Sequence, residues 1–246
     1  RLRRLPPLPA RWPSVSVIDT GHARLMDGVY ARQRHIYDAT RRYYLLGRDG
    51  LIDALDPPPG GTVLEVGCGT GRNLFALADR HADVRLYGFD LSTEMLSTAL
   101  ERALRHPRRC PIPAFAGRLG NVLIDPHPAD AATFDPLHTF GVPAFDRVFL
   151  SYTLSMIPAW REALAKGLDA VAPGGSLHVV DFGQQERLPR AFRAALNGWL
   201  GLFHATPRRE LREAAAALAE ARGTRLDFRR LYGGYAWSLT LSRPSL

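Results

Sequence analysis

Apolar positions recur along the chain with two different periods, and the change of period divides it. Between residues 21 and 55 they fall three and four positions apart, which predicts helices with one buried face. The run Pro57–Gly61 ends helix formation, and the β-branched run Thr62–Val66 that follows predicts a buried strand. Strand-like and helix-like runs then alternate, which predicts a parallel sheet with helices on both faces.

These runs give the expected order of elements. The expected strands are 62–66, 84–89, 145–150 and 176–182, with a further strand near 112–116, and the expected helices are 73–80, 95–104 and 160–171. Near the end, helical runs at 189–203 and 208–221 precede two strand-like stretches, 225–232 and 235–241, joined by Gly233-Gly234. The predicted fold class is α/β, with an antiparallel pair closing the sheet.

The composition argues against a disulfide-rich protein and against a membrane-spanning protein. The 246 residues are 46% hydrophobic and 23% charged, and two cysteines are too few for a disulfide framework. No apolar run reaches the ~18 residues of a membrane-spanning helix. Arg1–Arg4 is followed by prolines without an apolar segment, so we expect no signal peptide. The net charge of +8 comes almost wholly from arginine, which points to an anionic partner such as nucleic acid or a membrane surface.

The strongest chemical motif is the glycine-rich turn Glu65–Gly71, between an expected strand and an expected helix. Glycine allows a positive φ and the close approach of a ligand, and the helix that follows offers free N–H groups. Asp90 ends the next strand, about 20 residues on, where an acid suits ribose hydroxyls. The dinucleotide pattern G-x-G-x-x-G fails because Gly71 comes one position early.

The spacing G-x-G-x-G after Glu65 resembles motif I of the class I S-adenosylmethionine-dependent methyltransferases. Residues 145–152 and 172–177 resemble that family's fourth strand and the turn into its fifth. The resemblance implies a Rossmann-like sheet of seven strands with the last one antiparallel, and S-adenosylmethionine as cofactor. The loop after the expected third strand, 117–121, lacks the acid that often binds adenine. The implied cofactor residues are Glu65, Gly67, Cys68, Gly69, Thr70, Gly71, Asp90, Leu91, Leu119, Asn121 and Ser151.

A narrower resemblance extends through about residues 22–240. Segments 26–38, 42–49, 155–158 and 180–189 look like the bacterial betaine-lipid N-methyltransferases. That family trimethylates the amine of diacylglyceryl-homoserine to diacylglyceryl-trimethylhomoserine. It implies a cytoplasmic bacterial enzyme that associates peripherally with an anionic membrane surface. The implied partners are the lipid substrate and the enzyme that makes the homoserine lipid, and no nucleic acid is expected.

The expected organisation follows from the same resemblance. Residues 1–20 form a basic, proline-rich arm and residues 21–58 a helical lid. Residues 59–246 form the methyltransferase core, with an amphipathic helical insertion at about 187–221. The apolar face of that insertion carries tryptophan and phenylalanine and its other face carries arginine, which predicts a lipid entrance at a membrane interface. The alternative is a helix packed over the sheet.

Methyl transfer to an amine needs the amine held in line and relieved of a proton, and aromatic faces stabilise the ammonium product. The candidate catalytic residues are Tyr37, Tyr152 and Asp181, and the candidate substrate-binding residues are Tyr30, Arg34, Tyr43 and Arg48. Arg48 falls within the apolar face of its expected helix and therefore needs a partner. That partner is either Asp49 or Asp53, or a carboxylate of the cofactor or headgroup.

Three other functions stay open. A class I methyltransferase can act on a soluble amine or on RNA, although the arginines are dispersed and no RNA-binding motif is visible. A non-catalytic scaffold with a vestigial cofactor site is the third, and the intact glycine turn argues against it.

Overall fold

The computed structural model describes residues 44–105, 118–119, 121–125 and 127–245. Its centre is an eight-stranded sheet of order β3-β4-β2-β1-β5-β6-β8-β7. The strands are β1 (Thr62–Val66), β2 (Arg85–Phe89), β3 (Arg118–Leu119), β4 (Val122–Ile124), β5 (Phe145–Ser151), β6 (Val171–Phe182), β7 (Arg225–Leu231) and β8 (Ala236–Ser242). Strands β4, β2, β1, β5 and β6 are parallel, whereas β8 runs antiparallel between β6 and β7.

This arrangement confirms the predicted fold class: a Rossmann-like methyltransferase sheet with the last strand antiparallel. The short strand β3, antiparallel to β4, adds an eighth strand at one edge. The predicted closing hairpin is confirmed as β7 and β8, joined by a short 3₁₀ turn at Tyr232–Gly234. All five residues of β1 are buried, as expected for a central strand covered on both faces.

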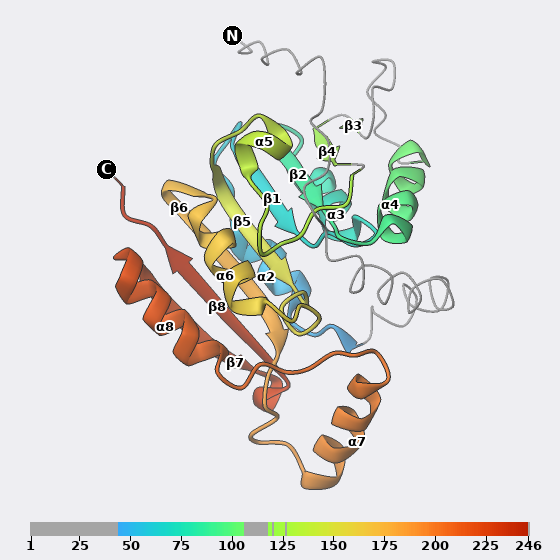
Figure 1. Ribbon diagram of the computed structural model, residues 1–246, viewed down its shortest axis with the longest axis vertical. Helices are drawn as coiled ribbons and strands as arrows, with labels where there is room; N and C mark the ends of the chain where they lie inside the picture. Colours follow the sequence, from blue (N-terminus) through green and yellow to red (C-terminus); the bar gives the residue numbers. More distant parts are fainter. Residues whose placement is uncertain (1–43, 106–117, 120, 126, 246) are drawn as a thin grey trace.

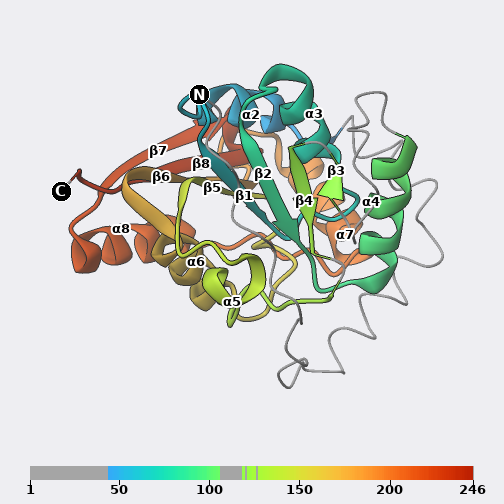
Figure 2. The ribbon, with the colours of Figure 1, turned by 90° about the horizontal axis from the view of Figure 1, so that it is seen from above.

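Helices cover both faces of the sheet (Figures 1 and 2). They are α2 (Arg48–Leu55), α3 (Arg72–Arg80), α4 (Thr93–Arg105), α5 (Pro136–Phe140), α6 (Trp160–Asp169), α7 (Arg190–Gly201) and α8 (Leu211–Arg222). Helices α2, α3 and α4 contribute to one apolar cluster, and α5, α6 and α8 contribute to another. Figure 2 shows α2 and α3 on one face and α5, α6 and α8 on the other. No described helix is long and apolar enough to cross a bilayer.

The third parallel strand lies later in the chain than predicted. The expected strand near 112–116 lies outside the described residues, and the strand that pairs with β2 is β4, Val122–Ile124. The stretch 117–121 therefore precedes this strand instead of following it. The residue that follows β4 is an acid, Asp125, so the prediction that the loop after the third strand lacks an acid was wrong.

The predicted lid and insertion are partly described. Of residues 21–58 the structure describes 44–58, where Ile52 and Leu55 of α2 are buried in the core next to the sheet. Of the insertion at 187–221, α8 packs in the core of the opposite face, and only α7 extends beyond the sheet (Figure 1). Leu196 and Leu200 are the buried residues of α7, so this helix is attached to the body by a narrow apolar stripe.

Candidate functional site

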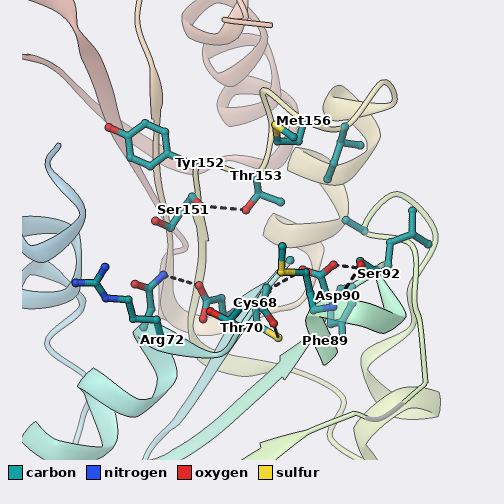
Figure 3. A pocket seen from close by; sticks show the side chains of 18 of the residues that line it. Cys68, Thr70, Arg72, Phe89, Asp90, Ser92, Ser151, Tyr152, Thr153 and Met156 are labelled. Carbon is teal, nitrogen blue, oxygen red and sulfur yellow. Dashed lines mark hydrogen bonds between the residues drawn. The ribbon is translucent and has the colours of Figure 1, made fainter. Parts of the chain in front are cut away.

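A large pocket opens where β1, β2 and β5 end (Figure 3). We call it the glycine-loop pocket. Its lining residues are Leu45, Arg48, Glu65, Gly67, Cys68, Gly69, Thr70, Arg72, Asn73, Phe89, Asp90, Leu91, Ser92, Met95, Ala129, Asp130, Ala131, Ser151, Tyr152, Thr153, Met156 and Ile157. The carboxyl ends of parallel strands are the usual place for a ligand in an α/β sheet.

The glycine turn forms the floor of this pocket because its backbone takes conformations that side chains disfavour. Gly67, Gly69 and Gly71 all have positive φ, at 72°, 54° and 71°. A Cβ atom on Gly67 would lie 2.4 Å from Cγ2 of Thr153, in the loop after β5. Only a residue without a side chain lets these two loops approach so closely.

Polar contacts hold the turn in place from three sides. Asp90 accepts a hydrogen bond from the Gly69 N–H at 2.7 Å and another from the Ser92 N–H at 2.9 Å. Asn73 donates to the buried Glu65 carboxylate at 2.6 Å. Arg102 of α4 donates to the carbonyl and hydroxyl oxygens of Thr70. The turn is therefore preorganised, and a ligand need not order it on binding.

Tyr152 follows β5 and faces the pocket with an unusual backbone, φ 56°. Non-glycine residues in this region are uncommon and concentrate at functional sites. Its hydroxyl donates to the Leu46 carbonyl at 2.5 Å, and the Tyr235 hydroxyl donates to the Tyr44 carbonyl at 2.8 Å. Burial raises the pKa of Tyr152 well above its usual value, so the hydroxyl stays protonated and keeps donating. The two tyrosines hold the segment Tyr44–Leu46 against the pocket.

Arg48 begins α2 and is only 6% exposed. It lines the glycine-loop pocket, and its positive charge acts on Tyr152. One of its two predicted internal partners, Asp53, points outward and pairs with Arg80 of α3 at 3.7 Å. Asp53 is therefore paired with α3, and Arg48 lies where a bound ligand could reach its guanidinium group.

Asp181 does not line the glycine-loop pocket, so the structure does not place it where its predicted catalytic role requires it. The side chain is fully buried in β6 and accepts hydrogen bonds from the backbone N–H of Ser155 at 3.0 Å and of Phe182 at 2.7 Å. Arg208 reinforces the same loop by donating to the carbonyls of Leu154 and Ile157. Asp181 is therefore a positioning residue for the loop after β5.

The burial of Asp181 predicts a pH-dependent stability. Desolvation raises its pKa from 3.8 to about 6, so the folded state holds a proton that the unfolded chain releases. This contribution is present at low pH and is lost as pH rises through about 6. Relative to Asp181→Asn, which cannot ionise, the wild type should lose about 1.4 kcal/mol of unfolding free energy between about pH 5 and about pH 8. Urea unfolding of both proteins across this range measures the difference, and parallel pH profiles would contradict the assignment.

Most of the predicted cofactor residues meet in the glycine-loop pocket. Glu65, Gly67, Cys68, Gly69, Thr70, Asp90, Leu91 and Ser151 line it. Gly71 does not line it and instead precedes α3 as its N-cap. The prediction that Leu119 and Asn121 contact the cofactor was wrong. Both residues precede β4, so they lie at the end of the sheet opposite to the pocket. The Asn121 amide binds the carbonyls of His81 and Val84 there.

Several lining residues were not predicted. Ala129, Asp130 and Ala131 come from the loop after β4, and Thr153, Met156 and Ile157 from the loop after β5. The apolar triplet Val122–Ile124 followed by Asp125 was the available sequence signal for the first group. The predicted residues Tyr30, Arg34, Tyr37 and Tyr43 lie outside the described residues.

His178 and Cys68 are both buried and uncharged. His178 lies inside β6 between Ser176 and Thr240, and burial lowers its pKa to about 4, so it is neutral. Burial and the nearby acids Asp90 and Glu65 raise the pKa of Cys68, so its thiol stays neutral. Among the described residues no group of His, Cys, Asp and Glu is suited to hold a metal ion.

A second hollow adjoins the pocket beneath α7. We call it the aromatic hollow. It is lined by Tyr44, Leu45, Tyr152, Met156, Phe182, Trp199, Leu200, Phe203 and Ala205. Its rings pack edge to face, with centroids 4.5 Å apart for Tyr44 and Trp199 and 4.6 Å apart for Tyr152 and Phe182. The two cavities share Leu45, Tyr152 and Met156.

Known methyltransferases are similar to this chain in sequence. A family model described as a methyltransferase domain matches residues 64–177. Phosphoethanolamine N-methyltransferase 3 of Arabidopsis thaliana is 37% identical over 102 residues, 38% of this chain and 21% of that protein. The ubiquinone/menaquinone biosynthesis C-methyltransferase UbiE of Paracoccus denitrificans is 27% identical over 174 residues, 69% of this chain and 63% of that protein.

A solved structure shows the same fold. Phosphoethanolamine N-methyltransferase 2 of Haemonchus contortus, bound to phosphomonomethylethanolamine and S-adenosylhomocysteine, superposes with a TM-score of 0.67 at 15% identity, over 93% of this chain and 61% of that one. The chain thus spans less than two thirds of the length of these relatives. The family match therefore covers a methyltransferase domain at residues 64–177, and the chain shares the fold of solved methyltransferases.

Proposed function

We propose, from the methyltransferase domain at residues 64–177, that this protein is an N-methyltransferase for the amine of diacylglyceryl-homoserine, with diacylglyceryl-trimethylhomoserine as product. One observation carries the proposal: the glycine-loop pocket and the aromatic hollow lie side by side and have three lining residues in common, Leu45, Tyr152 and Met156. An amine held at this junction would have the cofactor site on one side and an apolar, aromatic cavity on the other.

The residues of the glycine-loop pocket fit S-adenosylmethionine. The missing Cβ of Gly67 leaves room for a ligand to approach the turn closely, and the lining combines polar and apolar residues. Asp90 would hold the ribose hydroxyls. When bound, the cofactor would supply an electrophilic methyl group to the lone pair of an uncharged amine, with S-adenosylhomocysteine as the leaving group; the first two transfers each release a proton, and the third leaves a fixed positive charge on the nitrogen. The pocket residues orient the two reactants and exclude water.

The aromatic hollow supports an amine that becomes a quaternary ammonium. Successive methylation fixes a positive charge that can no longer donate hydrogen bonds, and aromatic faces attract such a cation by about 0.5–2 kcal/mol. Tyr44, Tyr152 and Trp199 offer such faces. The exposed Phe192 and Leu202 near α7 support an acceptor that is drawn from a membrane. The same features support association of the protein with the cytoplasmic membrane surface, alongside the enzyme that supplies the homoserine lipid.

A second candidate acceptor is a soluble phosphorylated amine, which the names of the plant and nematode relatives favour. Both acceptors are amines, so the cofactor site does not distinguish them. The aromatic hollow favours the lipid, because a soluble phosphoethanolamine has little apolar surface to bury.

The deciding experiment incubates the purified protein with methyl-labelled cofactor and, in parallel, with a bacterial total lipid extract, with diacylglyceryl-homoserine and with phosphoethanolamine. We expect label in lipids that carry a methylated homoserine headgroup. Label confined to phosphoethanolamine would establish the second candidate instead. Label confined to RNA in a parallel incubation would overturn both.

Arg48 provides a test of ligand binding on the acceptor side. If its guanidinium pairs with a carboxylate of the cofactor or headgroup, Arg48→Met should weaken binding of that ligand by about 10-fold or more. Calorimetry measures the cofactor affinity, and initial rates give the KM for the acceptor. The matched control is Arg80→Met, because Arg80 is an exposed arginine on the neighbouring helix α3. Unchanged values for both ligands in Arg48→Met would rule out this role.

A further inference from the structure

A third hollow lies at the base of α7, apart from the two cavities described above. We call it the arginine hollow; Gln184, Gln185, Glu186, Arg193, Asn197 and Arg209 line it. None of these residues lines the glycine-loop pocket or the aromatic hollow. Arg193 and Asn197 are one turn apart on α7, and the buried Leu196 and Leu200 separate them from the side that carries Trp199. The arginine hollow is thus a separate feature of the fold.

Its positive charge is not neutralised by the rest of the described chain. Neither Arg193 nor Arg209 makes an ion pair with any described residue. Glu186 is the single acid in the lining, and its carboxylate already accepts hydrogen bonds from Arg230 and from the indole of Trp237, both at 3.1 Å. The first turn of α7 also lacks an acid. An anion in this hollow would therefore meet two available guanidinium groups.

The hollow also contains an unused buried donor. The Gln184 Nε2 atom is buried and has no hydrogen-bond partner among the described residues. Buried donors are nearly always paired, so an orphan beside two arginines indicates that an acceptor occupies this place. Gln185 does not share this feature, because its amide donates to the Gly183 carbonyl. The amide of Asn197 adds a further donor at the rim.

We propose that the arginine hollow binds a phosphate oxyanion, presented by the headgroup of an anionic membrane lipid. Two guanidinium groups and two amide donors match the several acceptor oxygens of a phosphate. The lipid source is favoured by position, because Arg193 and Asn197 of the lining belong to α7. Figure 1 shows that this helix extends beyond the sheet. The exposed Phe192 and Leu202 at the two ends of that helix would enter the same membrane interface. This site would dock the protein on a membrane whichever amine it methylates.

The test measures sedimentation of the full chain with vesicles of phosphatidylcholine and phosphatidylglycerol in equal parts, and with phosphatidylcholine alone, at one ionic strength. Arg193→Gln combined with Arg209→Gln should weaken binding to the anionic vesicles by about 10-fold. The matched control, Arg190→Gln with Arg225→Gln, removes the same charge from exposed positions outside the hollow. We expect the control to change binding by less than about 2-fold. An equal loss in both pairs would overturn the proposal in favour of diffuse attraction.

A second variant tests the orphan donor without changing the charge. Gln184→Met removes a buried donor that lacks a partner, so it should raise Tm by about 2–4 °C while weakening vesicle binding by about 3-fold or more. A gain in Tm with unchanged vesicle binding would show that Gln184 has no part in the site and would overturn the proposed donor set.

A calorimetric titration with inorganic phosphate separates the two sources of the anion. Binding of phosphate without binding of anionic vesicles would replace the lipid by a soluble phosphate. Cofactor affinity and methyl transfer to detergent-dispersed acceptor, measured on the same variants, keep this result distinct from the proposed activity. Both should be unchanged in the arginine pair, since neither arginine lines the glycine-loop pocket or the aromatic hollow.

Discussion

Gly67→Ala should weaken cofactor binding by about 100-fold or more. The added Cβ would lie 2.4 Å from Cγ2 of Thr153, so one of two pocket-lining loops must move. Thr153 cannot simply rotate, because its hydroxyl donates to the carbonyls of Val66 and Ser151, both at 3.3 Å. Overpacking of this kind costs about 1–3 kcal/mol, and the positive φ of 72° adds to the strain. Calorimetric titration with S-adenosylhomocysteine measures the loss.

A control and a rescue isolate the steric cause. Gly141 has a similar φ of 68°, but a Cβ there meets nothing within 4 Å. Gly141→Ala should therefore lower stability slightly and leave cofactor affinity unchanged. Adding Thr153→Ser to Gly67→Ala removes the clashing methyl group and should restore a measurable part of the affinity. No recovery in the double variant would contradict the steric explanation.

Asp90→Ala should weaken cofactor binding by a similar factor for an electrostatic reason. The carboxylate holds the glycine turn through the Gly69 N–H and would also bind ribose hydroxyls. Hydrogen bonds to charged groups contribute about 1.5–3 kcal/mol each, so losing two corresponds to at least about 100-fold. Asp90→Asn, which retains one acceptor oxygen, should fall between wild type and Asp90→Ala in the same titration.

The matched control for Asp90 is Asp83→Ala. Asp83 also accepts a hydrogen bond from a glycine N–H, that of Gly60 at 3.0 Å, but it does not line the glycine-loop pocket. Its loss should leave cofactor affinity unchanged. A loss of less than about 3-fold in Asp90→Ala would mean that Asp90 serves the turn alone and does not bind the ligand.

The cofactor side of the site could be predicted because its signals are local. The glycine turn, the strand before it and the helix after it are contiguous, and Asp90 ends the next strand along the chain. The strand order then follows from general rules for parallel α/β sheets. No long-range information was needed to bring these residues together.

The third parallel strand could not be located in the same way because it has only three residues. Val122–Ile124 is too short for a distinct period-2 signal, and the nearby apolar stretch 112–116 competes with it. Pairing with β2 decides the outcome, and this is a long-range contact. The misplaced strand also explains the wrong prediction for Leu119 and Asn121. Their predicted contact with the cofactor required them to follow the third parallel strand, whereas they precede it.

Asp181 and α7 illustrate a second limit. An acid at the end of a strand can face a ligand or a neighbouring loop, and the local pattern is the same in both cases. One Asp181 oxygen accepts a hydrogen bond from Ser155 N–H in the loop after β5, the other accepts one from Phe182 N–H in β6, and the side chain is buried. For α7 the amphipathic pattern was correct: Leu196 and Leu200 pack inward, whereas Phe192 is exposed. The predicted lipid entrance at this helix stays a prediction.

The distribution of the two main cavities along the chain has an evolutionary consequence. No described residue after Ile157 lines the glycine-loop pocket, whereas α7 and its flank supply Trp199, Leu200, Phe203 and Ala205 to the aromatic hollow. A lineage could therefore replace the stretch between β6 and α8 and acquire a new acceptor without altering how it holds its methyl donor. Exchange of that one segment would change four of the nine residues that line the aromatic hollow and none of the described residues that line the glycine-loop pocket.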